Sequence, residues 1–372
     1  MDRVWTSTLD QSPGRGAWIN GRRWDITLLI GSALIVPVVL VCMWAGASSD
    51  FVNLGVTATI GGPHLFATYV ATYLDPRFRR SRWWVLVLAS ILVPAFVIYF
   101  AIHHFQVLMS VFIFAASFHV LQQNAFLTDV YRKRALQRDP WWSRVVDYGL
   151  LFVCIYPGAS YKLVNGTFYV GEIKILIPEV LMVRATYWTV WLFFGAFLVT
   201  WIGKTLVEWR RGEMNRPKTL LIAVTTVIAF SIPWMASRSK LELAFQSINA
   251  WHSLQYLGLV WYIQKVRKDR GLLEGRIPRA IAGSGRAAYY YYGFCLLVTM
   301  GLAGVLVPIA KTDPVGGLSF NQYYYMGVLS FLLIHYVLDA YLFAVGNRET
   351  SSLDDIPYAA PSLIPEEAAP AE

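Results

Sequence analysis

Charged side chains are scarce in this chain: Asp, Glu, Lys and Arg together make up 15% of its 372 residues, whereas 56% are hydrophobic. Soluble domains usually carry about 25% charged residues, so this composition argues against an ordinary water-soluble protein. Residues 1–25 contain four arginines and no apolar stretch, so we expect no N-terminal signal peptide. The composition is typical of a protein that crosses a membrane many times.

Cysteine is also scarce, and the three present lie in apolar segments without the spacing of a metal site. We interpret Cys42, Cys154 and Cys295 as core residues. No internal repeat is strong enough to indicate a transporter built from inverted halves. No HxxxH-like histidine box occurs, which disfavours the membrane desaturases and hydroxylases.

Long apolar runs are abundant, and most are roughly 18 to 23 residues long, enough for a bilayer core of about 30 Å. We count about ten, the fifth interrupted by Pro157, Gly158 and Lys162: 26–46, 54–74, 84–102, 107–127, 145–160, 186–207, 219–236, 244–264, 289–309 and 326–345. The sequence therefore predicts an all-α, polytopic membrane helix bundle. Residues 26–345 form its single transmembrane domain, between a basic N-terminus (1–25) and an acidic, disordered tail (346–372).

The net charge of +9 does not indicate nucleic-acid binding, because the large Lys and Arg counts fall on alternate loops. This is the positive-inside pattern, which predicts that both termini are cytoplasmic and that the basic clusters are topology signals. The clusters are Arg77, Arg79, Arg80 and Arg82; Arg132, Lys133 and Arg134; Arg210 and Arg211; and Lys265, Arg267, Lys268 and Arg270. Short loops and the absence of a targeting segment favour a bacterial inner membrane.

Histidine is rare too, and four of the six residues each lie near the middle of a different apolar run: His64, His119, His252 and His335. With the N-terminus inside, their four helices all run from outside to inside. The histidines come about 8 to 12 residues from the outer ends, within a slab of roughly 6 Å. Because ionisable groups in hydrocarbon are costly, we interpret them as one shared site. The alternative is that each imidazole satisfies a separate hydrogen bond between helices. His103 and His104 fall in a short outer turn and are left out.

Polar residues follow each central histidine by about one helical turn, on the same face of its helix. They are Thr68, Gln122, Gln123, Gln255, Tyr256 and Asp339. A metal-bound imidazole needs an acceptor at its second nitrogen, so we expect Gln122, Gln255 and Asp339 to orient the ligands. Tyr256 is expected to face an open coordination position as a donor. Asp339 could also bind the ion directly, or simply be hydrated near the cytoplasmic end.

Gly61, Gly62 and Pro63 directly precede His64. The proline removes a backbone hydrogen bond and leaves the carbonyl near Thr59 without its partner, and the glycines allow another helix to come close. A kink there would aim His64 inward. Imidazole suits Fe, Zn, Cu and Ni, so a mononuclear non-haem iron or zinc centre is the simplest expectation.

The ordered segments Gly62-Pro63-His64, Ser117-Phe118-His119, Trp251-His252-Ser253 and His335 followed by Asp339 resemble the histidine motifs of the bacterial Brp/Blh β-carotene dioxygenase family. The resemblance covers these four motifs alone. It implies an integral membrane, iron-dependent enzyme that cleaves a carotenoid with dioxygen to give retinal, with the four histidines holding the iron. The family has a second histidine in its third motif where this chain has Tyr256. Its acidic residues after the first two motifs are replaced here by Thr68 or Tyr69 and by Gln123 or Asn124.

The sequence thus favours a membrane-embedded metal-dependent oxygenase, with Fe(II) preferred over Zn, acting with dioxygen on a carotenoid, isoprenoid or other lipid. A proton-coupled transporter or channel that uses intramembrane His and Asp is the main alternative. A haem-binding membrane protein is a third, although haem stacks usually need histidines at two depths.

Overall fold

The computed structural model describes residues 18–343 except 136–138, 166–167, 171–172, 237–240, 284 and 314–315. The predicted acidic tail (346–372) and residues 1–17 of the predicted N-terminal segment lie outside this part of the chain. The fold is all-α, as predicted, apart from a two-stranded antiparallel pair, β1 (Tyr169–Val170) and β2 (Ile173–Lys174).

Seven of the described helical segments are long and apolar enough to cross a membrane, so the chain is a multi-pass membrane protein. The first joins α1 (Arg22–Trp24), η1 (Asp25–Ile30), η2 (Gly31–Leu34) and α2 (Ile35–Trp44). The others are α5 (Pro76–His103), α6 (Phe105–Arg134), α9 (Arg184–Arg210), α10 (Arg216–Ala236), α13 (Arg286–Thr312) and α14 (Phe320–Leu342).

The three remaining predicted spans correspond to helices that are shorter, interrupted or more polar. Residues 54–74 overlap α3 (Ser49–Val56), η3 (Thr57–Gly61) and α4 (Gly62–Ala71), and residues 145–160 overlap α7 (Trp141–Val153) and α8 (Tyr156–Val164). Residues 244–264 lie in α11 (Leu241–Asp269), and the short η4 (Glu179–Leu181) and α12 (Arg276–Ile281) complete the helices. The total of ten spans therefore stays a prediction.

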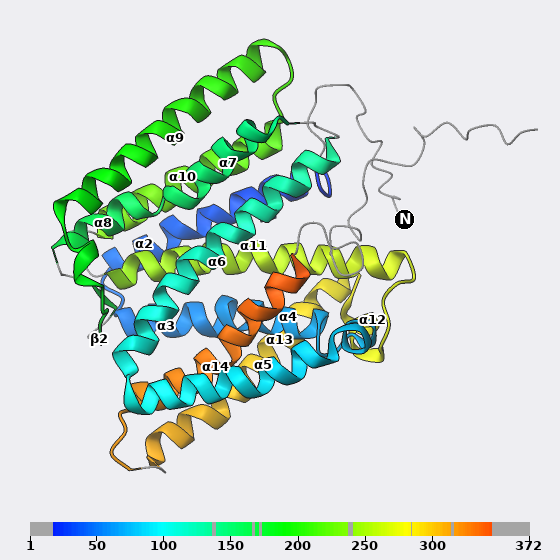
Figure 1. Ribbon diagram of the computed structural model, residues 1–372. Helices are drawn as coiled ribbons and strands as arrows, with labels where there is room; N and C mark the ends of the chain where they lie inside the picture. The colour runs from blue at the N-terminus through cyan, green and yellow to red at the C-terminus, as the bar shows by residue number, and fades with distance from the viewer. Residues whose placement is uncertain are drawn as a thin grey trace, which may run out of the picture.

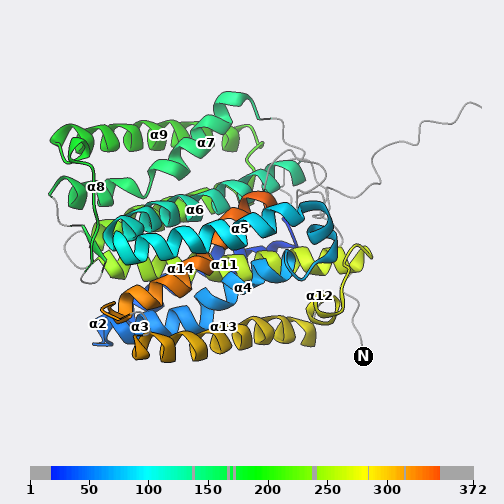
Figure 2. The same ribbon diagram turned by 60° about the horizontal axis from the view of Figure 1, so that its bottom comes forward.

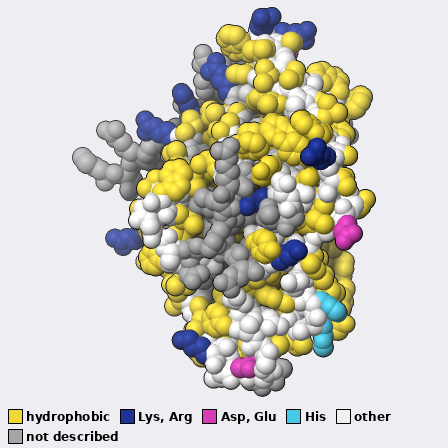
Figure 3. Space-filling view, turned by 90° about the vertical axis from the view of Figure 1, so that its left-hand side faces the viewer, with side chains coloured by type: hydrophobic (Ala, Val, Ile, Leu, Met, Phe, Trp, Pro, Cys, Tyr) yellow, Lys and Arg dark blue, Asp and Glu magenta, His cyan; other side chains and the backbone are white. Residues whose placement is uncertain are grey.

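Helix α11 runs through the middle of the bundle (Figures 1 and 2). It contacts α2, α4 and α10, and α10 in turn contacts α7 and α8, which pack on α9. On the other side α4 contacts α13 and α14, and α14 packs along α5. Hydrophobic side chains cover much of the face in Figure 3. Trp188, Leu192 and Val199 of α9 are at least 67% exposed, as expected for side chains that face lipid.

The Gly61-Gly62-Pro63 segment distorts its helix as predicted. The π-helical turn η3 ends at Gly61, and the carbonyl oxygen of Thr59, which Pro63 cannot bond, accepts a hydrogen bond of 2.7 Å from the hydroxyl of Tyr292 on α13. A Cβ atom on Gly62 would lie 2.2 Å from Cγ2 of Thr299. Only glycine therefore permits this approach of α13, and His64 follows directly in the tightly packed stretch.

Part of the basic cluster around Arg132 has a structural role that the sequence reasoning missed. The guanidinium of Arg132 is buried and contacts Asp129, Asp139 and Asp147 at 2.6 to 2.8 Å. Lys204 of α9 and Lys218 of α10 also reach Asp147 or Asp139. This ionic network ties α6, α7, α9 and α10 together, so Arg132 is more than a topology signal.

The cysteine interpretation is right for two residues and wrong for the third. Cys154 and Cys295 are buried, whereas Cys42 is exposed on α2. Its apolar surroundings in the sequence reflect a lipid-facing helix surface rather than the protein core.

Candidate metal centre

The four central histidines meet at one place in the bundle, as the sequence predicts. His64 comes from α4, His119 from α6, His252 from α11 and His335 from α14. Each offers a ring nitrogen, and the four nitrogens lie within 4.8 Å of one another; all four side chains are buried. The ring of His64 lies edge-on to those of His252 and His335, with centroids 5.0 and 4.6 Å away. His103 and His104 are exposed at the turn between α5 and α6, outside this group.

Hydrogen bonds indicate which nitrogen of His64 carries its proton. Its Nδ1 lies 2.9 Å from the carbonyl oxygen of Gly61, which can only accept, so Nδ1 donates. The hydroxyl of Ser253 lies 3.2 Å from the same nitrogen. The Nε2 of neutral His64 is then left with its lone pair free.

His335 has the same arrangement through a longer relay. Its Nδ1 lies 2.6 Å from the hydroxyl oxygen of Thr68, and that hydroxyl donates to Oδ1 of Asp339 over 3.1 Å. When the Thr68 proton goes to Asp339, Nδ1 of His335 is the donor and its Nε2 carries a lone pair. The Nε2 atoms of His64 and His335 are 3.1 Å apart. In that arrangement two lone pairs face each other at this distance, and they repel each other unless they share a proton or bind the same cation.

Further polar atoms at this place have no hydrogen-bond partner among the described residues. They are both ring nitrogens of His252, Nε2 of His119 and Oδ2 of Asp339. The last two lie 3.6 Å apart. Leaving a buried polar atom unpaired costs about 1–3 kcal/mol, so four of them beside one another need an explanation. A shared proton would serve only two nitrogens, whereas a metal ion serves all four histidines.

The spacing of the nitrogens fits a single ion. Metal–imidazole bonds of about 2.0–2.1 Å place neighbouring ligand nitrogens about 2.9–3.4 Å apart and opposite ones about 4.2 Å apart. The Nε2 atoms of His64 and His335, 3.1 Å apart, have the spacing of neighbouring ligands. All four nitrogens lie within 4.8 Å of one another, which is slightly more than the spacing of opposite ligands. The four buried histidines could therefore hold a metal ion, and the all-nitrogen set suits Fe, Zn, Cu or Ni.

Asp339 lies beside the histidines and joins three helices. Its Oδ1 accepts hydrogen bonds from Thr68 and, at 2.6 Å, from the hydroxyl of Tyr256, and Thr68 and Tyr256 also contact each other. Nδ1 of His335 is 3.5 Å from the same oxygen. Asp339 is 2% exposed, so the alternative that it is merely hydrated at a helix end is wrong. Tyr256 packs beside His64 and His335, with its hydroxyl engaged by Asp339 and Thr68.

The glutamines lie differently from the prediction. No hydrogen bond among the described residues joins Gln122 to a histidine ring, and its side chain is only partly buried. The neighbouring Gln123 is buried and donates to Oε1 of Gln255 at 2.6 Å and to the carbonyl oxygen of His252 at 3.4 Å. Gln255 donates in turn to the carbonyl of Leu29. Gln123 rather than Gln122 therefore faces α11, and it contacts the backbone of that helix and Gln255 rather than a histidine ring.

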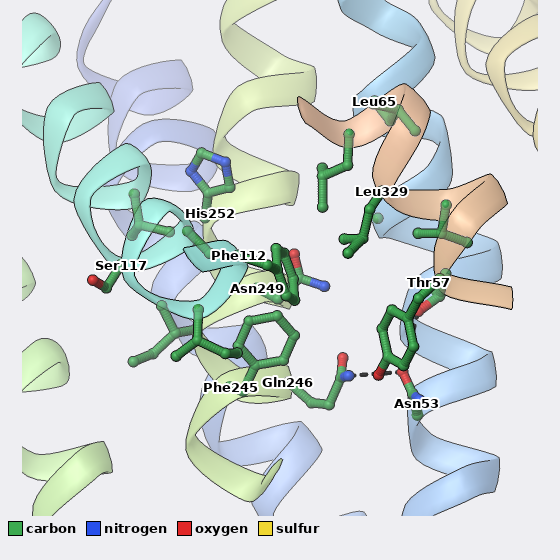
Figure 4. Close-up of a pocket in the computed structure, with 18 of the residues that line it drawn as sticks. Asn53, Thr57, Leu65, Phe112, Ser117, Phe245, Gln246, Asn249, His252 and Leu329 are labelled. Carbon is green, nitrogen blue, oxygen red and sulfur yellow. Dashed lines mark hydrogen bonds between the residues drawn. The ribbon is translucent and has the colours of Figure 1, made fainter. Parts of the chain in front are cut away.

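A cavity of about 630 Å³ opens beside the histidines. His64 and His252 line it, together with mainly aliphatic and aromatic residues of α3, α4, α6, α8, α11, α13 and α14 (Figure 4). Its described lining contains no Asp, Glu, Lys or Arg. Tyr256, Thr68 and Asp339 are not among the lining residues, so the polar network lies behind the histidine layer and the apolar cavity in front of it.

Sequence reasoning missed two contacts of the histidines. Tyr336 stacks on the ring of His119 with centroids 4.2 Å apart and lines the cavity, and Ser253 contacts His64. Both residues directly follow a central histidine in the chain. Adjacent helical residues point about 100° apart, so helix periodicity gives no reason to select them.

Comparison with protein-family models, with curated proteins and with solved structures finds no match for this chain.

Proposed function

We propose that the protein is a membrane-embedded oxygenase with one non-haem Fe(II) ion held by His64, His119, His252 and His335. The observation that carries the proposal is the group of buried, unpaired histidine nitrogens directly beside a large apolar cavity. Bound Fe(II) would supply the ability to activate dioxygen, and zinc is the alternative ion for this ligand set. The ordered motifs that resemble the Brp/Blh family favour iron.

The surrounding residues prepare the four rings for binding. Gly61 and Thr68 hold the Nδ1 protons of His64 and His335, which keeps both Nε2 lone pairs directed at the ion. Asp339, fixed by Thr68 and Tyr256, places a carboxylate oxygen 3.6 Å from Nε2 of His119. That oxygen orients His119 or completes the ligand set.

The cavity supports an apolar substrate. Its volume lies in the range of about 300–1,000 Å³ that small-molecule sites usually have, and its apolar walls exclude water from the ion. Phe51 and Leu54 line the cavity and are also 70% and 68% exposed, so a carotenoid, isoprenoid or other lipid would enter sideways from the bilayer.

The cavity favours this proposal over the other two. A proton-coupled transporter needs a polar, water-filled path, and the described lining of this cavity lacks charged residues. A haem needs room for its flat ring between two histidines, whereas these rings lie against each other with centroids 4.6 to 5.0 Å apart.

The topology belongs to the same proposal. We place the ends of the helices that carry the basic clusters in the cytoplasm of a bacterial inner membrane, with about ten crossings and both termini inside. The cavity then opens in the outer half of the bilayer.

Metal analysis of the protein, purified in detergent under anaerobic, iron-replete conditions, tests the proposal. We expect about one iron per chain, and its loss in His64→Ala and His335→Ala. His103→Ala is the matched control, because this histidine is exposed and lies outside the group of four. Consumption of dioxygen with an added carotenoid or isoprenoid then tests the reaction. Wild-type protein without bound metal would refute the proposal.

A further inference from the structure

The cavity is lined by histidines in one part and by a pair of amide side chains in another. Asn53 of α3 and Gln246 of α11 line it and are joined by a hydrogen bond of 2.7 Å from Nε2 of Gln246 to Oδ1 of Asn53 (Figure 4). The hydroxyl of Thr57 donates to the same Asn53 oxygen over 3.3 Å. These groups stand out because most of the cavity wall is aliphatic or aromatic.

One atom of this polar group lacks a partner. Gln246 is 8% exposed, and its Oε1 has no hydrogen bond among the described residues. Its Nε2 donates to Oδ1 of Asn53, and the same oxygen accepts from the hydroxyl of Thr57, which leaves Oε1 of Gln246 as the unpaired atom. The unpaired atom is therefore an acceptor that needs a donor. A hydroxyl group can donate to it, whereas an ether or ester oxygen cannot.

The position of the pair suits the head of a membrane amphiphile. Asn53 and Gln246 lie in the first two turns of α3 and α11. On the proposed topology they are close to the outer membrane boundary, and His64 and His252 lie deeper. Along α11 the distance from Gln246 to His252 is about 9 Å, and along α3 to α4 the distance from Asn53 to His64 is about 16 Å. A lipid in the outer leaflet is oriented in the same way as the cavity, with its polar group at the interface and its chain toward the bilayer centre.

Charge narrows the class of head group. The described cavity lining contains no cationic side chain that would neutralise a carboxylate or phosphate and no acidic one that would bind an amine. Burying an uncompensated charge is much more costly than burying a hydroxyl.

From these observations we propose that the substrate is an uncharged long-chain alcohol whose terminal hydroxyl donates to Gln246, with the reacting bond about 9 to 16 Å away beside the metal. This assignment rests on the proposed function, because it names the substrate class of the same site. The amide pair would then act as a ruler that fixes which bond of the chain reaches the ion.

Binding without turnover tests the assignment. The probes are radiolabelled geranylgeraniol, its methyl ether and geranylgeranoic acid, each added to the purified protein without dioxygen. We expect the alcohol to bind about 2- to 10-fold more tightly than the ether, the range for one neutral hydrogen bond, and the acid to bind least well. Gln246→Met, which keeps the length of the side chain, should remove the preference for the alcohol, and Gln106→Leu, on the exposed side of α6, should keep it.

Asn53→Ala provides a second variant should Gln246→Met fail to fold, since it releases the Gln246 amide and should reduce the preference. Equal binding of alcohol and ether by the wild type, or an unchanged preference in both variants, would overturn the assignment. The two proposals can fail separately. Protein that prefers the alcohol but binds no iron refutes the proposed oxygenase. Protein that binds iron but does not prefer the alcohol refutes the assignment of an alcohol substrate.

Discussion

Thr68→Val should weaken metal binding without removing a ligand. The hydroxyl of Thr68 lies 2.6 Å from Nδ1 of His335 and donates to Asp339, so it fixes both the tautomer and the orientation of that ring. Valine has nearly the same shape but cannot bond either group. Loss of such an orienting contact typically costs 10- to 100-fold in metal affinity, or about 1.4 to 2.8 kcal/mol. We therefore expect the dissociation constant for iron to rise by about one to two orders of magnitude.

The assay is competition for iron with a chelator of known affinity, followed by metal analysis of the separated protein. Thr72→Val is the matched control, because Thr72 lies one helical turn further along and is equally buried. Among the described residues its hydroxyl bonds only the backbone carbonyl of Thr68. It should lose some stability and keep its iron affinity. If Thr68→Val folds and binds iron as tightly as the wild type, the relay from His335 through Thr68 to Asp339 does not prepare the site.

The remaining predictions concern packing and charge. Gly62→Ala should lower the free energy of unfolding by about 1–3 kcal/mol in denaturant titration, because its Cβ would collide with Thr299, whereas Gly55→Ala, with open space around it, should not; equal effects would refute the close contact. Asp147→Asn should lower the free energy of unfolding by about 3–5 kcal/mol, because the substitution leaves Arg132 and Lys204 buried without their shared carboxylate. A change below about 1 kcal/mol would show that the network contributes little. Burial raises the pKa of Asp139, but attraction by Lys218 and Arg132 outweighs it and holds this pKa below the ordinary 3.8. The stabilisation by Asp139 should therefore be fully present above pH 3.8 and be lost as the pH falls through the lower folded-state pKa, and Asp139→Asn should abolish this part of the pH dependence of unfolding.

Several site features could be read directly from residue types. Histidines in the middle of apolar runs are costly unless they serve a purpose, and the predicted topology places these four at one depth, so their meeting is predictable. The Gly61-Gly62-Pro63 segment was equally predictable, because proline leaves a backbone carbonyl without its helical partner and glycine leaves space for another helix. Tyr292 bonds that carbonyl, and Thr299 packs against Gly62.

Contacts between helices were not predictable in the same way. Thr68 follows His64 in the chain but serves His335 on another helix, and Gln123 rather than Gln122 faces α11. One residue changes the direction of a side chain by about 100°, so small differences in helix rotation decide which neighbour takes part.

The sequence by itself determined the membrane class, the helical architecture and the candidate ligands, because each follows from the cost of placing polar groups in hydrocarbon. Only the tertiary structure decided which nitrogens are left unpaired, where the cavity lies and that Asn53 and Gln246 meet at its far end. These depend on how helices distant in the sequence pack together, and hydrophobic periodicity within one helix carries no information about its partner.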